Sequence, residues 1–388
     1  MRVRAGMWSE TERTATLGRI ESMASPVLSL YLTTGSSPVD RRNLSSRAKS
    51  TIDALDVSQS VRDKALTELE RHGPFPIGVA IFVQCDSLDA FTVGMPVEMP
   101  IEVPGTGRGL ASVGEPAIGP LWAATQRVDH HGVLQISNDR WRSFHVSDED
   151  AVELDKDRRV PTEPEADVKE NSRQKRMAWG ADRSDDHVDR MEATLEADRR
   201  RFFDDAARRT QEQMSRRGLQ DLLVLGPEDA RKRLETVLDS DRSMTVRAWM
   251  PAPPESEASP MRIRDLLQPE IERLRRERQT ETLDHIAERG LIGPEACVEA
   301  WQQGRLRRVL VGFPTGFEVW MALDGSTLAF SRKGAELHRF DGGARRVSLD
   351  EALPELADRF DVEVEILQGD PKERLNAEYG GMAGLIRW

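Results

Sequence analysis

The stretch "DLLVLGPEDARKRLETVLDSDRSMTVRAWM" (residues 221–250) decides the fold class, because it changes periodicity twice. Its first part (221–227) is a short apolar run ending in Gly-Pro, typical of a buried strand followed by a turn. Next, "EDARKRLETVLD" spaces its apolar residues as a helix does, and "SMTVRAWM" is rich in the β-branched and aromatic residues of strands. A strand, a helix and a strand in succession predict a mixed α/β sheet.

The alternation continues on both sides of this stretch. Before it we expect strands at 25–32, 77–84, 90–95, 131–139, 141–147 and 151–155, and helices at 43–56, 60–72, 117–126 and 185–217. Gly218 would end the helix expected at 185–217. After it we expect helices at 261–288, 293–304 and 348–360, strands at 306–313 and 362–367, and a polar excursion at 325–347. Three consecutive α/β domains follow, at 1–126, 127–277 and 278–388.

Composition limits the classes of protein. The chain has 388 residues, which is too long for one ordinary core, and its formal net charge is −12. A nucleic-acid partner would therefore have to meet local basic patches. The two cysteines, Cys85 and Cys297, form no disulfide framework and fit a reducing compartment. No signal peptide or membrane-length apolar run occurs, so we expect a soluble, cytoplasmic protein without a membrane partner.

One basic patch is "KENSRQKRMAWGADR" (169–183), which has five Lys or Arg residues against two acidic ones and precedes the long helix at 185–217. Its cations can neutralise phosphates and its Trp can stack on a base. The candidate RNA-binding residues are Lys169, Arg173, Gln174, Lys175, Arg176, Trp179 and Arg183. The alternative is a basic linker.

A second patch, "DRRNLSSRAK", lies in the first domain. Its candidate RNA-binding residues are Arg41, Arg42, Asn43, Arg47 and Lys49. We expect Asn43 or Ser45 to cap the following helix, which would leave backbone N–H groups available to a phosphate. A solvated helix start explains the same residues.

Conventional catalytic constellations are scarce in the sequence. His130, His131 and His145 lie on strand-like segments, where adjacent residues point to opposite faces, so structural roles are expected for them. There is no P-loop, and neither thiol has a recognisable partner for nucleophilic chemistry. We expect no catalytic residues, no metal and no cofactor.

The end of the chain, "GGMAGLIRW" (380–388), suggests a family. It resembles the closing motif of the class-I release factors of archaea and eukaryotes, which their ribosome-rescue homologue Pelota shares. Paired glycines allow positive φ and close backbone approach, and the apolar run suits a sheet centre, although any α/β domain could end this way. Three further segments, "SPVLSLYL", "IGPLWAATQRVDHHGVLQIS" and "GLQDLLVLGPEDARKRLETVL", are similar to bacterial members of this superfamily. The resemblance covers nearly the whole chain and implies the family's three-domain architecture.

The resemblance also defines what is missing. In the release factors, a middle-domain loop between a strand and a long helix carries Gly-Gly-Gln, whose Gln positions a water against the peptidyl-tRNA ester. The matching segment here (165–186) lacks that motif: Gln174 lies between Arg173 and Lys175, and Gly180 stands alone. The hydrolytic role is therefore not implied, whereas RNA contact is. The stop-codon motifs of the family's first domain, which sits in the decoding centre, have no convincing counterpart either.

Three functions remain open. The first, which we favour, is a non-enzymatic factor that occupies the ribosomal A site, contacts rRNA of both subunits and has the GTPase EF-Tu as partner. It resembles the bacterial ribosome-hibernation factors typified by Balon and implies a stress role without DNA binding. The second is a ribosome-rescue enzyme that hydrolyses peptidyl-tRNA through Gln174 or another residue of the same loop. The third is a stress-associated protein that kept the fold but lost the ribosome.

Overall fold

The computed structural model forms two compact units. One comprises Met1–Val128 together with Glu270–Trp388, and the other comprises Asp129–Pro269. The residues that the structure describes are 3–4, 10–33, 43–72, 78–95, 109–126, 128–148, 150–159, 185–238, 244–253, 257–322, 327–331 and 343–387. Within these ranges, no helix is both long enough and apolar enough to cross a lipid bilayer.

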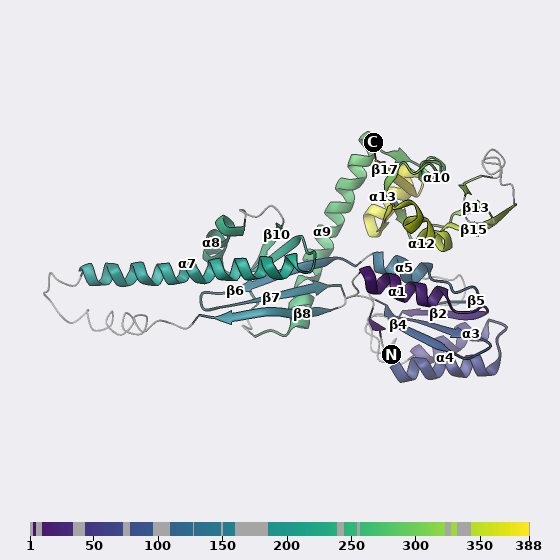
Figure 1. Ribbon diagram of the computed structural model, residues 1–388, viewed down its shortest axis with the longest axis horizontal. Coiled ribbons are helices and arrows are strands. Elements are labelled where there is room, and N and C mark those ends of the chain that lie inside the picture. The colour runs from purple at the N-terminus through teal and green to yellow at the C-terminus, as the bar shows by residue number, and fades with distance from the viewer. Residues whose placement is uncertain are drawn as a thin grey trace. The chain divides into compact units, whose positions relative to one another are not determined.

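The N-terminal part of the first unit is a five-stranded sheet between two layers of helices (Figure 1). Its strand order is β1 (Val3–Arg4), β4 (Ala90–Met95), β3 (Gly78–Gln84), β2 (Val27–Thr33) and β5 (Gly109–Gly114). Helices α1 (Glu10–Glu21) and α5 (Gly119–Gln126) pack on one face, and α3 (Leu44–Asp53) and α4 (Gln59–His72) on the other. Because both faces are covered, every residue of β2 is buried, as its continuous apolar run predicts.

The C-terminal part of this unit has a second sheet with the order β11 (Leu291–Ile292), β17 (Met382–Ile386), β12 (Leu306–Gly312) and β16 (Glu363–Leu367). Helices α10 (Pro294–Gln302) and α12 (Leu349–Phe360) pack on one face, and α13 (Gly369–Tyr379) on the other. A small antiparallel sheet of β14 (Leu328–Ala329), β13 (Glu318–Ala322) and β15 (Ala344–Ser348) adjoins it.

The paired glycines of the closing motif behave as the sequence predicts. Gly380 ends α13 with φ 65°, and Gly381 follows with φ 86°. A Cβ on Gly381 would lie 2.9 Å from the ring of Phe317, so the backbone approaches that ring too closely for any side chain. Strand β17 then enters the sheet between β11 and β12.

The second unit contains the mixed α/β sheet predicted from residues 221–250. Its order is β10 (Thr245–Met250), β9 (Asp221–Leu225), β6 (His130–Ile136), β7 (Arg140–Ser147) and β8 (Ala151–Arg158). The first three strands are parallel, and β6, β7 and β8 form an antiparallel meander. Helices α7 (Asp185–Ser215) and α8 (Glu228–Leu238) cover one face, and α9 (Pro260–Arg289) begins within this unit. The mixed α/β class is thus confirmed.

Two expectations about elements need correction. Residues 325–347 were expected to be a polar excursion, but they contain β14 and most of β15. These strands are only two and five residues long and pair with β13 rather than with each other, so local periodicity gives no sign of them. Helix α1 and strand β5 also lie where we expected no element.

Candidate nucleic-acid interface

The seven candidate residues of the basic stretch, from Lys169 to Arg183, lie outside the described residues, as do Arg41 and Arg42. Their role in RNA binding stays a prediction. The structure describes the two elements that lead into and out of the stretch, which are β8 and α7.

Strand β8 is held against α7 by Arg209. Its guanidinium donates to both carboxylate oxygens of Asp155, at 2.6 and 2.9 Å, and to Asp157 at 2.8 Å. The same group lies 4.9 Å from the ring centroid of Trp141 on β7. A bidentate ion pair combined with a cation–π contact fixes the orientation of the Arg209 guanidinium as well as its distance from the Asp155 carboxylate. We call these four residues, Trp141, Asp155, Asp157 and Arg209, the Arg209 clamp.

Among the described side chains of helix α7, the first buried one is Leu195. The buried residues of α7 recur at helical spacing, and they are Leu195, Phe203, Ala206, Ala207, Thr210 and Met214. Arg233 on α8 adds an ion pair to Glu196 and lies over the ring of Phe203. The helix begins at Asp185, so roughly 15 Å of it precede the first of these packed residues. Figure 1 shows this part extending beyond the strands of its own sheet.

The patch in the first domain is brought together only in part. Asn43 occupies the N-cap position of α3, but its side chain makes no capping hydrogen bond, and Ser45 lies inside the helix. The expected side-chain cap is therefore wrong. Arg47 donates to the carbonyl of Thr33 at 2.9 Å and so ties α3 to the end of β2, whereas Lys49 is exposed. This hydrogen bond gives Arg47 a structural role at the point where β2 ends.

Two of the three histidines on the middle sheet meet each other. Nδ1 of His130 lies 3.0 Å from Nε2 of His145, and such a bond requires at least one neutral ring. Burial lowers the pKa of His145 to about 4, with the charges of His130 and Arg217 acting in the same direction. Burial also lowers the pKa of His130. His131 is buried, and no three His, Cys, Asp or Glu side chains in the described ranges are arranged to hold a metal ion.

The clamp could not be found from sequence. Trp141 and Arg209 are far apart in the chain, and an Arg among many on an Arg/Glu-rich helix looks like a solvated residue. The only local signal is the alternation of aspartates at 155 and 157, which places both carboxylates on one face of a strand.

A comparison with protein families finds a match in the middle of the chain. Residues 116–265 match bacterial archaeo-eukaryotic release factor family 10. The match covers less than half of the chain, but it includes the whole middle sheet, both helices on its face and the basic stretch. It supports the resemblance of the chain to the archaeo-eukaryotic release-factor superfamily. No curated protein matches the chain.

Several solved structures align with most of the chain at low identity. Archaeal translation termination factor aRF1 is 14% identical over 98% of this chain and 99% of its own, with a TM-score of 0.23. Archaeal Pelota, in a ribosome-bound assembly with ABCE1, is 15% identical over 96% and 94%, with a TM-score of 0.42. Dom34 of S. cerevisiae, a termination-like factor that interacts with Hbs1, is 9% identical over 80% of each chain, with a TM-score of 0.37. All three TM-scores lie below 0.5.

The order of elements along the chain gives the clamp a position relative to the basic stretch. Asp157 lies just before the end of β8, and the chain passes from there through the basic stretch into α7. Both ends of the basic stretch therefore belong to elements that pack together in one unit. Rigid flanking elements position a binding segment more precisely than mobile ones do.

Proposed function

We propose that this chain is a ribosome-binding translation factor of the release-factor superfamily. The observation that carries the proposal is the family match over residues 116–265, which includes a strand, a basic segment and a long helix in succession. In this proposal the factor occupies the A site and contacts rRNA of both subunits. The basic stretch meets the large subunit, and Arg41, Arg42, Asn43, Arg47 and Lys49 are the candidates at the small subunit.

The proposed role is protection of idle ribosomes under stress, without catalysis, as in the hibernation factors typified by Balon. The supporting observation is chemical. Residues 165–186 have no paired glycines, so the backbone there lacks the freedom that close approach to a peptidyl-tRNA ester requires. Fold alone does not fix function, and this argument therefore rests on the segment's own residues.

The test combines ribosome binding with peptide release. We expect the full-length protein to cosediment with ribosomes from stationary-phase cells and to release no peptide from peptidyl-tRNA on stalled ribosomes. If the protein does not cosediment with ribosomes, the proposal of a ribosome-binding factor is wrong.

The alternative is a rescue hydrolase that uses Gln174, the one Gln in the segment that replaces the catalytic loop. Robust peptide release that Gln174→Ala abolishes would establish that alternative, and release unaffected by the substitution would point to another residue. Cosedimentation without release supports the non-enzymatic role.

We further propose EF-Tu as the partner GTPase, with residues 278–388 as the first place to look. Residues 270–388 and 1–128 form one compact unit, so a truncation would damage the fold that it is meant to test. Hydrogen exchange of the full chain, with and without GTP-bound EF-Tu, avoids this problem. Protection within 278–388 supports the assignment, and protection confined to 129–269 contradicts it.

A further inference from the structure

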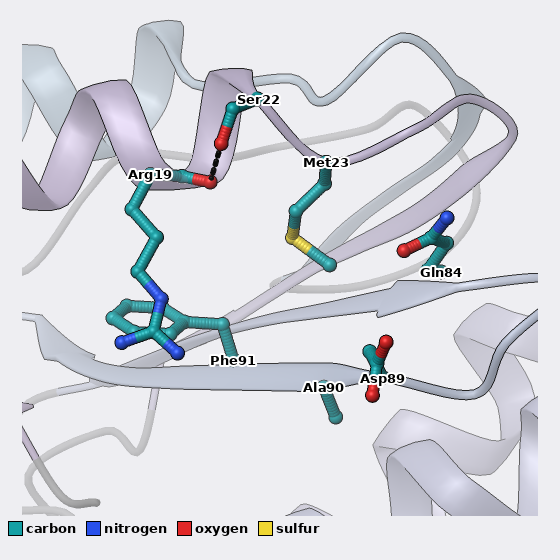
Figure 2. A pocket seen from close by; sticks show the side chains of 7 residues that line it. All are labelled: Arg19, Ser22, Met23, Gln84, Asp89, Ala90 and Phe91. Carbon is teal, nitrogen blue, oxygen red and sulfur yellow. Dashed lines mark hydrogen bonds between the residues drawn. The ribbon is translucent and has the colours of Figure 1, made fainter.

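A pocket of about 420 Å³ lies in the N-terminal part of the first unit (Figure 2). Helix α1 and the segment after it form one wall, and the β3–β4 hairpin forms the other. The lining residues are Arg19, Ser22, Met23, Gln84, Asp89, Ala90 and Phe91. A volume of this size is within the range of small-ligand sites.

The alternation of the hairpin explains why polar and aromatic groups meet here. Phe82 and Phe91 are cross-strand partners, and both pack in the core that lies under α1. Gln84 lies two residues after Phe82, and Asp89 two residues before Phe91, so both belong to the same face of the hairpin. The last turn of α1 brings Arg19 over this face.

The pocket has two chemically different ends. At one end the Arg19 guanidinium lies 5.0 Å from the ring centroid of Phe91, and no carboxylate within the described ranges forms an ion pair with it. At the other end lie the Gln84 amide and the Asp89 carboxylate, which accepts a hydrogen bond from the Ser87 hydroxyl at 2.9 Å. The Met23 side chain lies between the two ends (Figure 2).

A nucleotide matches this arrangement group by group. Its phosphate suits the Arg19 guanidinium, which has no carboxylate partner among the described residues, and its base suits a surface made of an aromatic ring and a thioether. An ionised carboxylate only accepts hydrogen bonds, so Asp89 selects a base edge with an amino group. Adenine, cytosine and guanine carry such a group, whereas uracil has no amino group and presents a single N–H between two carbonyl oxygens.

We propose that this pocket binds one unstacked nucleotide of single-stranded RNA, with the phosphate at Arg19 and an amino-bearing base edge at Asp89 and Gln84. The choice of RNA over a free nucleotide rests on the proposed function, because a ribosome exposes single-stranded RNA. The pocket would recognise the same phosphate and base groups in RNA and in a free nucleotide.

The test measures fluorescence anisotropy of labelled eight-nucleotide RNAs with the full-length protein. All variants also carry alanine at Arg173, Lys175 and Arg176, so that binding by the basic stretch does not mask the pocket. We expect oligo(A) and oligo(C) to bind more tightly than oligo(U). Arg19→Ala should weaken binding and flatten the log–log salt slope by about 0.7, the value for one phosphate contact with a single strand.

Two further substitutions separate stacking from edge recognition. Phe91→Leu keeps an apolar side chain and removes the ring, so affinity should fall about 5- to 150-fold with the salt slope unchanged. Asp89→Asn should narrow the preference for oligo(A) over oligo(U), because an amide can also donate. The control is Arg71→Ala on α4, which removes the same charge on the opposite face of the sheet and should change nothing.

Each outcome decides one point. Displacement of oligo(A) by AMP at equal concentration would support the pocket but assign it to free nucleotides, and failure of AMP to displace it supports RNA. Equal binding by the Arg19→Ala and Arg71→Ala variants overturns the pocket. Ribosome cosedimentation of the wild-type protein is scored separately, so the proposed function can stand when the pocket fails.

Discussion

Adjacent arginines on α7 have different surroundings, and this difference yields a prediction. The Arg209 side chain is 29% exposed and belongs to the clamp, whereas Arg208 is 60% exposed and pairs with Asp205 and Glu212 along its own helix. Arg209→Ala should lower the free energy of unfolding of the middle unit by about 1–3 kcal/mol, because two carboxylates and an aromatic face lose their partner. Chemical denaturation of the full chain measures the change.

The control is Arg208→Ala. Exposed helix pairs contribute little, so the free energy of unfolding of this variant should not differ measurably from that of the wild type. Similar losses for both arginines would mean that the clamp contributes no more than an ordinary surface pair.

His145 predicts a dependence of stability on pH. Its folded pKa is lowered to about 4, while an unfolded histidine titrates near 6.5. Below pH 6.5 the unfolded chain therefore takes up a proton that the folded chain does not, and stability falls as the pH drops towards 4. Between pH 7 and pH 5 the wild type should lose about 1–2 kcal/mol more than His145→Gln, whose amide can still hydrogen-bond His130.

Denaturation at the two pH values, with both proteins in the same buffers, checks this prediction. Parallel pH profiles for wild type and variant would show that His145 does not carry the effect.

At the residue scale, the sequence predicted features that depend only on neighbouring residues in the chain. Gly380 and Gly381 were expected to adopt positive φ, and they do. The cap of α3 was also a local expectation, but it failed because Asn43 takes the N-cap position without using its side chain. The clamp and the nucleotide pocket join residues from separate elements, and no periodicity within one element can reveal such a contact.

At the element scale, long periodic segments were predictable. The expected helix at 185–217 is α7, which ends at Ser215 just before Gly218 with φ 66°. Short strands were not predictable. Strands β14 and β15 gain their stability from pairing with β13, and their own sequences show little strand periodicity. Strand β5 is similar, since its position at the end of the sheet, beside β2, follows only from the tertiary fold.

The basic stretch yields a prediction at this scale. Replacing Arg173, Lys175 and Arg176 by Ala should weaken ribosome binding and flatten its log–log salt dependence by roughly two to three units, because each phosphate contact releases counterions. Cosedimentation across a salt titration measures the slope. Affinity equal to that of the wild type at every salt concentration would show that the stretch is only a linker.

Trp179 should act differently from these cations. Stacking on a base releases no counterions, so Trp179→Ala should lower affinity by about 1–3 kcal/mol while leaving the salt slope nearly unchanged. A slope that flattens as it does in the triple variant would contradict a stacking role.

At the scale of the molecule, one apolar core joins the two ends of the chain. The cluster that contains Ile20, Tyr31 and Trp122 also contains Trp301 and Leu353, so residues 1–128 and 270–388 are buried against each other. Helix α5 mediates this contact: its residues from Gly119 to Thr125 are all buried, and it packs against α12. The expected division at 126 did not predict this pairing, because the partners lie more than two hundred residues apart.

The last prediction tests that shared core through a matched pair of glycines. A Cβ on Gly119 would overlap the carbonyl oxygen of Asp350 and lie 3.2 Å from its carbon, so Gly119→Ala forces the backbones of α5 and α12 apart. We expect a cost of about 1–3 kcal/mol, seen as faster hydrogen exchange of amides in both helices. A Cβ on Gly18 in α1 meets nothing within 4 Å, so Gly18→Ala should stabilise the unit by about 0.5–1 kcal/mol. Faster exchange in α5 without any change in α12 would mean that the two segments share no cooperative core.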